Sequence, residues 1–115
     1  MTALQLQDLT MMANEPCVRD VRLGEALGFA RPRDVRQLIS ANLDEILLHG
    51  LARRVAAPIR SGKGRTQIVE EYYLNEAQAL LVCMFARTAK AAEIRRQVIE
   101  VFMAWRRGLT QKVDE

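Results

Sequence analysis

The sequence predicts a single α+β domain in which a helix-turn-helix is followed by a basic β-hairpin and two C-terminal core helices. A chain of 115 residues suits one domain with one core. Two short helical patterns stand close together near residue 30, and strand-forming residues flank a polar, glycine-containing segment at residues 60–65. We expect the domain to span residues 1–108, with residues 109–115 as a frayed tail.

Basic residues are concentrated in the middle of the chain. The formal net charge is only +3, from 17 Lys and Arg against 14 Asp and Glu. Residues 31–65 carry eight basic and three acidic side chains, whereas residues 66–115 carry seven of each. The excess positive charge therefore coincides with the second helical pattern and the predicted hairpin.

The N-terminal segment favours short extended structure from Leu4 to Met12, broken near Asp8. Asn14 and Pro16 favour a turn, so we expect a small hairpin between residues 9–13 and 17–18. Cys17 and Cys83 lack the spacing of metal ligands and lie among apolar residues, which predicts two buried free thiols.

The first helix is expected from Asp20, whose carboxylate can accept hydrogen bonds from free amides of the first turn, to the residue before Gly28. Pro32 suits the first turn of a second helix, because its missing N–H costs nothing there. A connection of three or four residues that includes Gly is the spacing of a helix-turn-helix.

The second helix divides into two faces. An apolar stripe includes Val35, Leu38 and Ile39, and the opposite face carries Arg33, Arg36, Gln37 and Ser40. Asn42 and Asp44 predict a break and a new short helix ending near Gly50.

The rest of the chain predicts a hairpin and two helices. Residues 51–74 are rich in strand formers around the basic segment 60–65. Asn75 and Gln78 match a capping box for a helix over residues 77–87, which is apolar nearly all round and so should be buried on most sides. Thr88 can cap a last helix that we expect to end at Gly108.

Catalytic and cofactor patterns are weak in this sequence, so we expect no enzyme, cofactor or metal site. His49 stands at a helix end, and Glu70 and Glu71 would point to opposite faces of a strand. Gly62-Lys63 fails the phosphate-loop pattern at positions 57 and 64. With neither a signal-peptide pattern nor an apolar run of ~20 residues, we expect a cytoplasmic protein that does not enter a membrane.

Double-stranded DNA is the partner that the charge placement favours. Arg33, Arg36 and Gln37 suit base edges in the major groove, while Ser40 or Arg31 suits a phosphate. Basic residues of the hairpin suit the DNA backbone or the minor groove: Arg53, Arg54, Arg60, Lys63 and Arg65. Most aromatic residues lie on predicted apolar faces, which leaves few to stack on the bases of single-stranded nucleic acid. Tyr72 or Tyr73 is the exception that could do so.

Three segments resemble small prophage regulators of the Rha family, which is related to the KilA-N and BRO-N modules of phage antirepressors. They are residues 23–39 (LGEALGFARPRDVRQLI), 71–79 (EYYLNEAQA) and 99–107 (IEVFMAWRR). The resemblance covers about residues 15–108. It implies a winged-helix-like DNA-binding domain of a phage or prophage transcriptional regulator.

Two points stay open in the sequence. The helix over residues 93–107 can supply a homodimer contact, or Phe102 and Trp105 can simply close the monomer core. A second function is equally consistent with the charge: an antirepressor or inhibitor that binds a phage or host regulatory protein and touches DNA little. Apolar residues exposed on a helix would favour that alternative.

Overall fold

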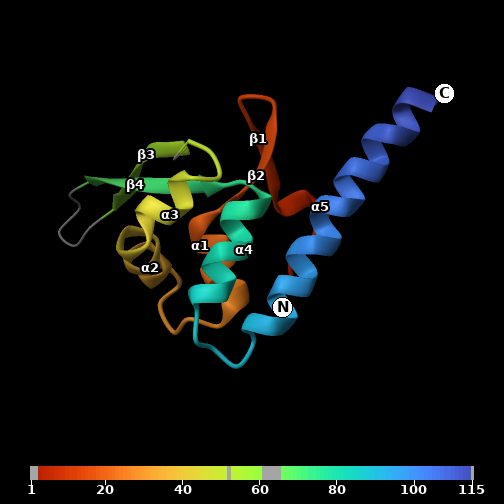
Figure 1. Ribbon diagram of the computed structural model, residues 1–115. Helices are drawn as coiled ribbons and strands as arrows, with labels where there is room; N and C mark the ends of the chain where they lie inside the picture. The colour runs from red at the N-terminus through yellow and green to blue at the C-terminus, as the bar shows by residue number, and fades with distance from the viewer. Residues whose placement is uncertain (1–2, 52, 61–65, 115) are drawn as a thin grey trace.

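The computed structural model describes residues 3–51, 53–60 and 66–114, and side-chain surroundings for residues 3–51, 55 and 70–108. It is an α+β fold in which a four-stranded antiparallel sheet of order β1-β2-β4-β3 lies over helices (Figure 1). The elements in chain order are η1 (Leu6–Asp8), β1 (Leu9–Met12), β2 (Glu15–Arg19), α1 (Asp20–Leu27), η2 (Pro32–Asp34), α2 (Val35–Ala41), α3 (Leu43–Leu47), β3 (Arg53–Arg60), β4 (Thr66–Leu74), α4 (Glu76–Phe85) and α5 (Ala91–Asp114).

The predicted N-terminal hairpin is confirmed, but its turn lies at Ala13 and Asn14 and not at residues 14–16, because Glu15 and Pro16 pair with β1 as part of β2. Ala13 and Asn14 both have positive φ, 52° and 66°, as a tight two-residue hairpin turn requires. Residues 6–8, by contrast, form a 3₁₀ turn where we expected extended chain. The cause is local, because the Asp8 carboxylate accepts a 2.9 Å hydrogen bond from the backbone N–H of Gln5 and curls the segment.

The two short helices near residue 30 begin and end close to the predicted boundaries. Gly28 ends α1 at φ 87°, and η2 begins at Pro32 as one 3₁₀ turn before α2. Gly24, inside α1, explains how closely the two helices meet: a Cβ built on it would lie 2.4 Å from the Pro32 carbonyl oxygen. The backbone of η2 therefore rests directly on α1 at a position where only glycine fits.

Replacing Gly24 with Ala tests this close approach. In an exposed helix Gly→Ala stabilises by about 1 kcal/mol, but here the added methyl overlaps a backbone oxygen. We expect Gly24→Ala to destabilise the fold by about 1–3 kcal/mol, as overpacking does. Urea unfolding followed by circular dichroism measures this, and an unchanged or raised midpoint would show that η2 moves away without cost.

The β3–β4 hairpin extends well beyond the rest of the sheet. The two strands pair from Arg53 with Tyr73 to Arg60 with Thr66, eight pairs in all. Among the described residues, β2 pairs with β4 through Val18 and Arg19 alone, at the end where β4 finishes. Most of the predicted hairpin is thus confirmed as a two-stranded ribbon projecting from the body (Figure 1), and the predicted tip at residues 61–65 lies outside the described residues.

The predicted capping box at the start of α4 is confirmed and does more than cap. The N–H of Gln78 donates to Asn75 Oδ1 at 2.9 Å, and the N–H of Asn75 donates to Gln78 Oε1 at 3.0 Å. The same two side chains donate to the carbonyls of His49 at 2.8 Å and Gly50 at 3.1 Å. This buried pair therefore fastens the turn between α3 and β3 to the first turn of α4.

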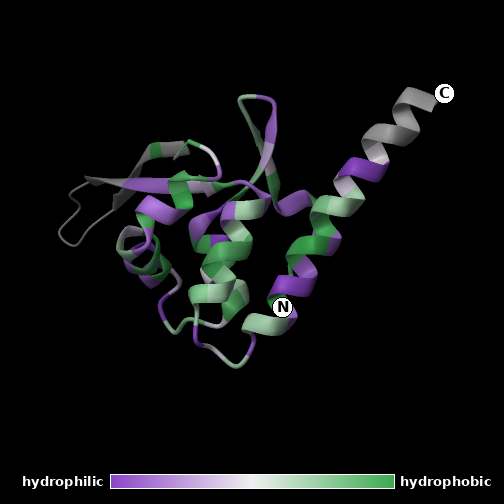
Figure 2. Cartoon of the chain, viewed as in Figure 1, coloured by the Kyte–Doolittle hydropathy of each residue, from purple (hydrophilic) through white to green (hydrophobic). Residues whose placement is uncertain are grey.

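The core lies where α1, α2, α4 and α5 meet the sheet, and Figure 2 shows hydrophobic residues gathered along these contacts. α4 is buried on most sides, as predicted, because Met84 is its one exposed residue and the others are buried or half-buried. One prediction about the C-terminal helices is corrected. α5 does not end at Gly108 but continues to Asp114, since one glycine costs a helix only about 1 kcal/mol.

Cys17 and Cys83 are both buried thiols outside any disulfide, as predicted. Burial raises the pKa of the Cys83 thiol to about 12, an effect that Arg95 opposes. The raised pKa keeps the thiol protonated, and therefore unreactive, at neutral pH.

Alkylation at about pH 8 tests this protection, because the thiolate is the reactive form. We expect labelling of Cys83 in the native protein to be as slow as unfolding, and rapid in denaturant. The unfolded thiol loses its proton near pH ~8.5, so stability should fall as pH rises from there toward the folded-state pKa. Cys83→Ala should lessen that alkaline loss; fast native labelling would contradict burial.

Candidate nucleic-acid interface

The outer face of α2 is exposed much as predicted. Arg33, Gln37 and Ser40 are exposed, while Val35 and Ile39 on the opposite face are fully buried. These positions recur at three- and four-residue spacing because the helix repeats every 3.6 residues. We call Gln37 and Ser40, together with Arg33 of the η2 turn that leads into the helix, the α2 face.

Arg36 does not belong to this free surface, which corrects the sequence prediction. Its Nε donates to Asp20 Oδ2 at 2.9 Å, and a terminal nitrogen reaches Asp20 Oδ1 at 3.5 Å. The guanidinium also lies 4.0 Å from Glu71 Oε1, and the side chain is only 22% exposed. Arg36 therefore neutralises interior carboxylates and is not available to read a base.

Asp20 is fully buried and joins three elements. Besides Arg36, it accepts a 2.9 Å hydrogen bond from the backbone N–H of Tyr72 in β4 and a 2.6 Å bond from that of Val21. The Val21 bond satisfies one free amide of the first helical turn, as predicted, although the N-cap of α1 is Arg19 and not Asp20. The other contacts hold α2 and the base of the β3–β4 ribbon in a fixed relation.

Glu71 extends this network toward the surface. It lies 3.9 Å from Arg19 and accepts a 3.4 Å hydrogen bond from the Tyr73 hydroxyl. Burial, and next the negative charge of Glu71, raise the pKa of Tyr73. Tyr72 is 8% exposed, so it is not available to stack on bases, and Tyr73 is committed to Glu71.

Basic residues of the ribbon are placed by their backbone alone. Arg53, Arg54 and Arg60 belong to β3, and their side chains lie outside the described part of the structure. Lys63 and Arg65 lie outside the described residues altogether. Arg54 pairs with Tyr72, whose N–H is bonded to Asp20, so the basic strand begins beside the carboxylate that anchors α2.

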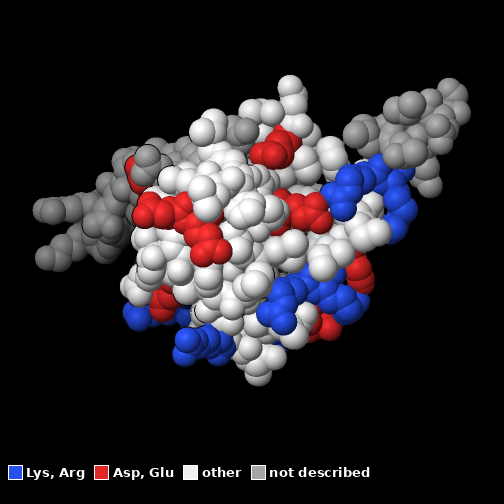
Figure 3. Space-filling model, in the orientation of Figure 1, with Lys and Arg blue, Asp and Glu red and all other residues white. Residues whose placement is uncertain are grey.

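Charge is unevenly spread around α2. Acidic side chains cluster over α3, where Asp44 and Glu45 are exposed, and Lys and Arg gather at the lower edge of the view and along α5 (Figure 3). Arg31 lies beside the α2 face with a side chain 72% exposed and its Nε 3.4 Å from Asp34. Sequence reasoning missed two exposed cations, Arg87 and Lys90, because they stand in the segment whose net charge is zero.

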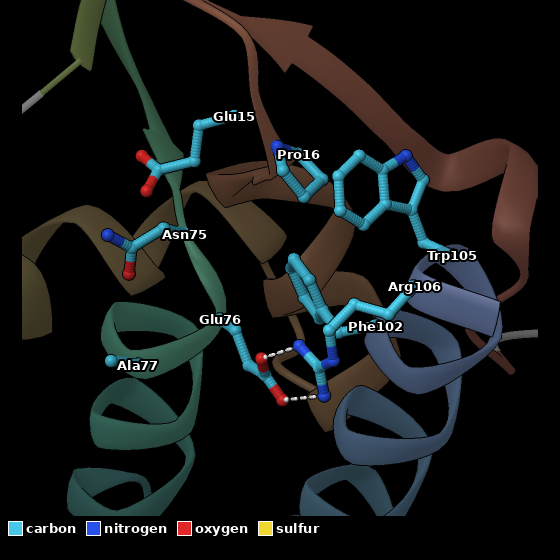
Figure 4. Close-up of a pocket in the computed structure, with 8 residues that line it drawn as sticks. All are labelled: Glu15, Pro16, Asn75, Glu76, Ala77, Phe102, Trp105 and Arg106. Atoms are coloured by element: carbon cyan, nitrogen blue, oxygen red, sulfur yellow. Dashed lines mark hydrogen bonds and ion pairs between the residues drawn. The ribbon is translucent and has the colours of Figure 1, made fainter. Parts of the chain in front are cut away.

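The hollow between α4 and α5 was not predicted. Its cavity volume is about 280 Å³, and its lining includes Pro16, Phe102 and Trp105 (Figure 4). Glu76 and Arg106 form a 2.6 Å ion pair at its edge. Phe102 is buried in the core, whereas Trp105 is only half-buried, so the two aromatic residues that we expected to act together have different surroundings.

Among the described residues, no three His, Cys, Asp or Glu side chains gather as ligands for one metal ion. None of the described helices combines the length and the apolar character needed to cross a bilayer.

Comparison of the chain with protein-family models, curated proteins and solved structures finds no match. The resemblance to prophage regulators stays a prediction.

Arg33 and Arg36 form a matched pair for mutation, because they stand one helical turn apart and differ in burial. Arg36→Ala leaves the Asp20 carboxylate buried without its cation, which should destabilise the fold by about 3 kcal/mol. Arg33→Ala removes an exposed side chain and should change stability by less than ~0.5 kcal/mol. Chemical denaturation measures both; equal effects would show that the Asp20–Arg36 pair does not support the fold.

Proposed function

We propose that this chain is a double-stranded DNA-binding transcriptional regulator of the phage or prophage type, acting in the cytoplasm. One observation carries the proposal. A projecting two-stranded ribbon, whose segment 53–65 has five basic residues and no acidic one, is anchored by Asp20 beside a helix with an exposed polar face. Both a helix and a two-stranded ribbon fit the DNA major groove, and a basic ribbon also suits the backbone.

The α2 face supplies the sequence-reading groups. Arg33 can pair bidentately with guanine and Gln37 with adenine, and the two lie one helical turn apart on the same face. Ser40 and Arg31 suit phosphate oxygens at the two ends of this face. Because Arg36 is held by Asp20, base reading on α2 rests on Arg33 and Gln37.

The ribbon supplies attraction that is independent of sequence. Lys and Arg side chains that neutralise phosphates release condensed counterions, so each contact makes binding more sensitive to salt. We assign this role to Arg53, Arg54, Arg60, Lys63 and Arg65.

Arg33→Ala and Lys63→Ala separate the two roles. We expect Arg33→Ala to lose about 1–3 kcal/mol of discrimination at one base position. Lys63→Ala should weaken binding to all sequences alike and reduce the slope of log K against log salt by about 1. Fluorescence anisotropy with a selected site and random duplexes measures both.

The binding site for this assay comes from selection of fragments of genomic DNA at ~0.15 M salt, where non-specific attraction is weak. Gln37→Ala, which removes the other expected base contact, should shift preference at a different position from Arg33→Ala. Failure to enrich any sequence, or equal losses on specific and random DNA for both Arg33→Ala and Lys63→Ala, would contradict the assignment.

A second function is favoured by one feature of the surface. Leu48 is 80% exposed and Leu51 is 72% exposed at the turn after α3, close in sequence to the acidic Asp44 and Glu45. Exposed neighbouring leucines are typical of protein-binding surfaces. We propose this turn as the contact of an antirepressor-type interaction with a phage or host regulatory protein, which the fragment selection above distinguishes from DNA binding.

A homodimer through α5 remains part of the proposal. Ile99 and Met103 stand one turn apart on α5, and both are more than 40% exposed. A two-fold dimer through this face would present two α2 faces to a palindromic site.

A further inference from the structure

Two connections that are far apart in the sequence meet at one end of the molecule. They are the turn between α1 and η2, residues 28–31, and the connection between α4 and α5, residues 86–90 (Figure 1). The contact is close, because a Cβ built on Gly28 would lie 3.5 Å from Cδ of Lys90. The Lys90 stem therefore runs along the α1–η2 turn, as long basic side chains commonly do while their charge stays in water.

This end carries three exposed cations, Arg31, Arg87 and Lys90, which we call the basic end. Figure 3 shows Lys and Arg gathered along this lower edge of the molecule. Within the described part of the chain, Arg87 and Lys90 form no ion pair, and Arg31 is paired only with Asp34.

Apart from Asp34, which pairs with Arg31, the nearby carboxylates Glu25 and Glu93 are held by other arginines. Glu25 of α1 lies 3.3 Å from Arg22. Glu93, in the first turn of α5, is hydrogen-bonded to Arg96, and these bonds lower the pKa of Glu93. The basic end therefore presents positive charge with little competition from its own surface.

The basic end is continuous with the α2 face. Arg31 is two residues from Arg33, and η2 is the single turn that separates the α1–η2 connection from α2. The ribbon lies on the opposite side of α2 (Figure 1). A duplex seated on α2 would thus meet basic side chains on both flanks.

We propose that the basic end binds phosphates of the DNA backbone on the side of α2 away from the ribbon, through Arg87 and Lys90 with Arg31. This inference rests on the proposed DNA-binding function. Phosphate is the group that fits this surface, which is basic and lacks exposed large apolar side chains. Among the described residues, every exposed large apolar side chain lies outside residues 28–31 and 86–90. A lysine acts there as a point charge and an arginine as a fork of donors, and neither selects a base.

The test is the double variant Arg87→Gln with Lys90→Gln in the full chain, measured against the selected site and random duplexes. We expect the salt slope to fall by about 2 and the affinity to fall roughly tenfold on every sequence. Base preference should be unchanged. Hydroxyl-radical footprinting should lose protection at the edge of the site farthest from the ribbon.

Two control variants separate position from net charge. Lys90→Arg keeps the cation and should bind like the parent chain. Arg107→Gln removes one exposed charge from α5, away from the basic end, and should leave the slope unchanged, whereas Lys90→Gln alone should lower it by about 1. Circular dichroism confirms that each variant is folded.

The outcomes separate phosphate binding by the basic end from the proposed DNA-binding function of the whole chain. A double variant that keeps the parent affinity and salt slope would show that the basic end does not bind phosphates, while leaving the DNA-binding function in place. A parent chain that binds no duplex at all would overturn both.

Discussion

The structure depends on one buried carboxylate. Removing Asp20 from water costs several kcal/mol, and the cost is offset only if a cation and further hydrogen bonds surround it. Arg36 provides the cation, and the N–H groups of Val21 and Tyr72 provide the hydrogen bonds. Because these partners come from α1, α2 and β4, their packing angles are fixed together.

That interaction also divides the arginines of the second helix by role. Arg33 and Arg36 look equivalent in the sequence, since both stand on the polar side of the same helix. The interior carboxylates remove Arg36 from solvent and leave Arg33 exposed. Under the proposed function, Arg36 holds α2 in place and Arg33, one turn away, reads a base. A loss of DNA binding on mutation therefore does not by itself show which of these two roles was removed.

Local patterns in the sequence predicted most of the fold, while long-range partners lay beyond it. The N-terminal hairpin, whose turn the sequence placed one residue too late, the end of α1 at Gly28 and the Asn75–Gln78 cap each depend on residues close together in the chain. Such signals are readable from the chain alone. The Asp20–Arg36 and Gly24–Pro32 contacts join separate elements. Sequence periodicity predicts the helix face on which a residue lies, but not which residue of another element will contact it. The charge of residues 31–65 was likewise visible, whereas Arg87 and Lys90 gained significance only when folding brought Lys90 against Gly28.

Under the proposed function, the placement of charge restricts how a duplex can lie on the molecule. Exposed acidic side chains on α3 would repel phosphates from one side of α2 (Figure 3), while the basic end and the basic sequence of residues 53–65 would attract them. Phosphate contacts fix the register of a protein on DNA, and base contacts then select the sequence. With cations on both flanks and Asp20 fixing the helix between them, Arg33 and Gln37 would meet base edges in one orientation. Under the proposed function, discrimination by only two side chains would require that fixed orientation, because a helix that tilts in the groove would let a long arginine reach neighbouring bases.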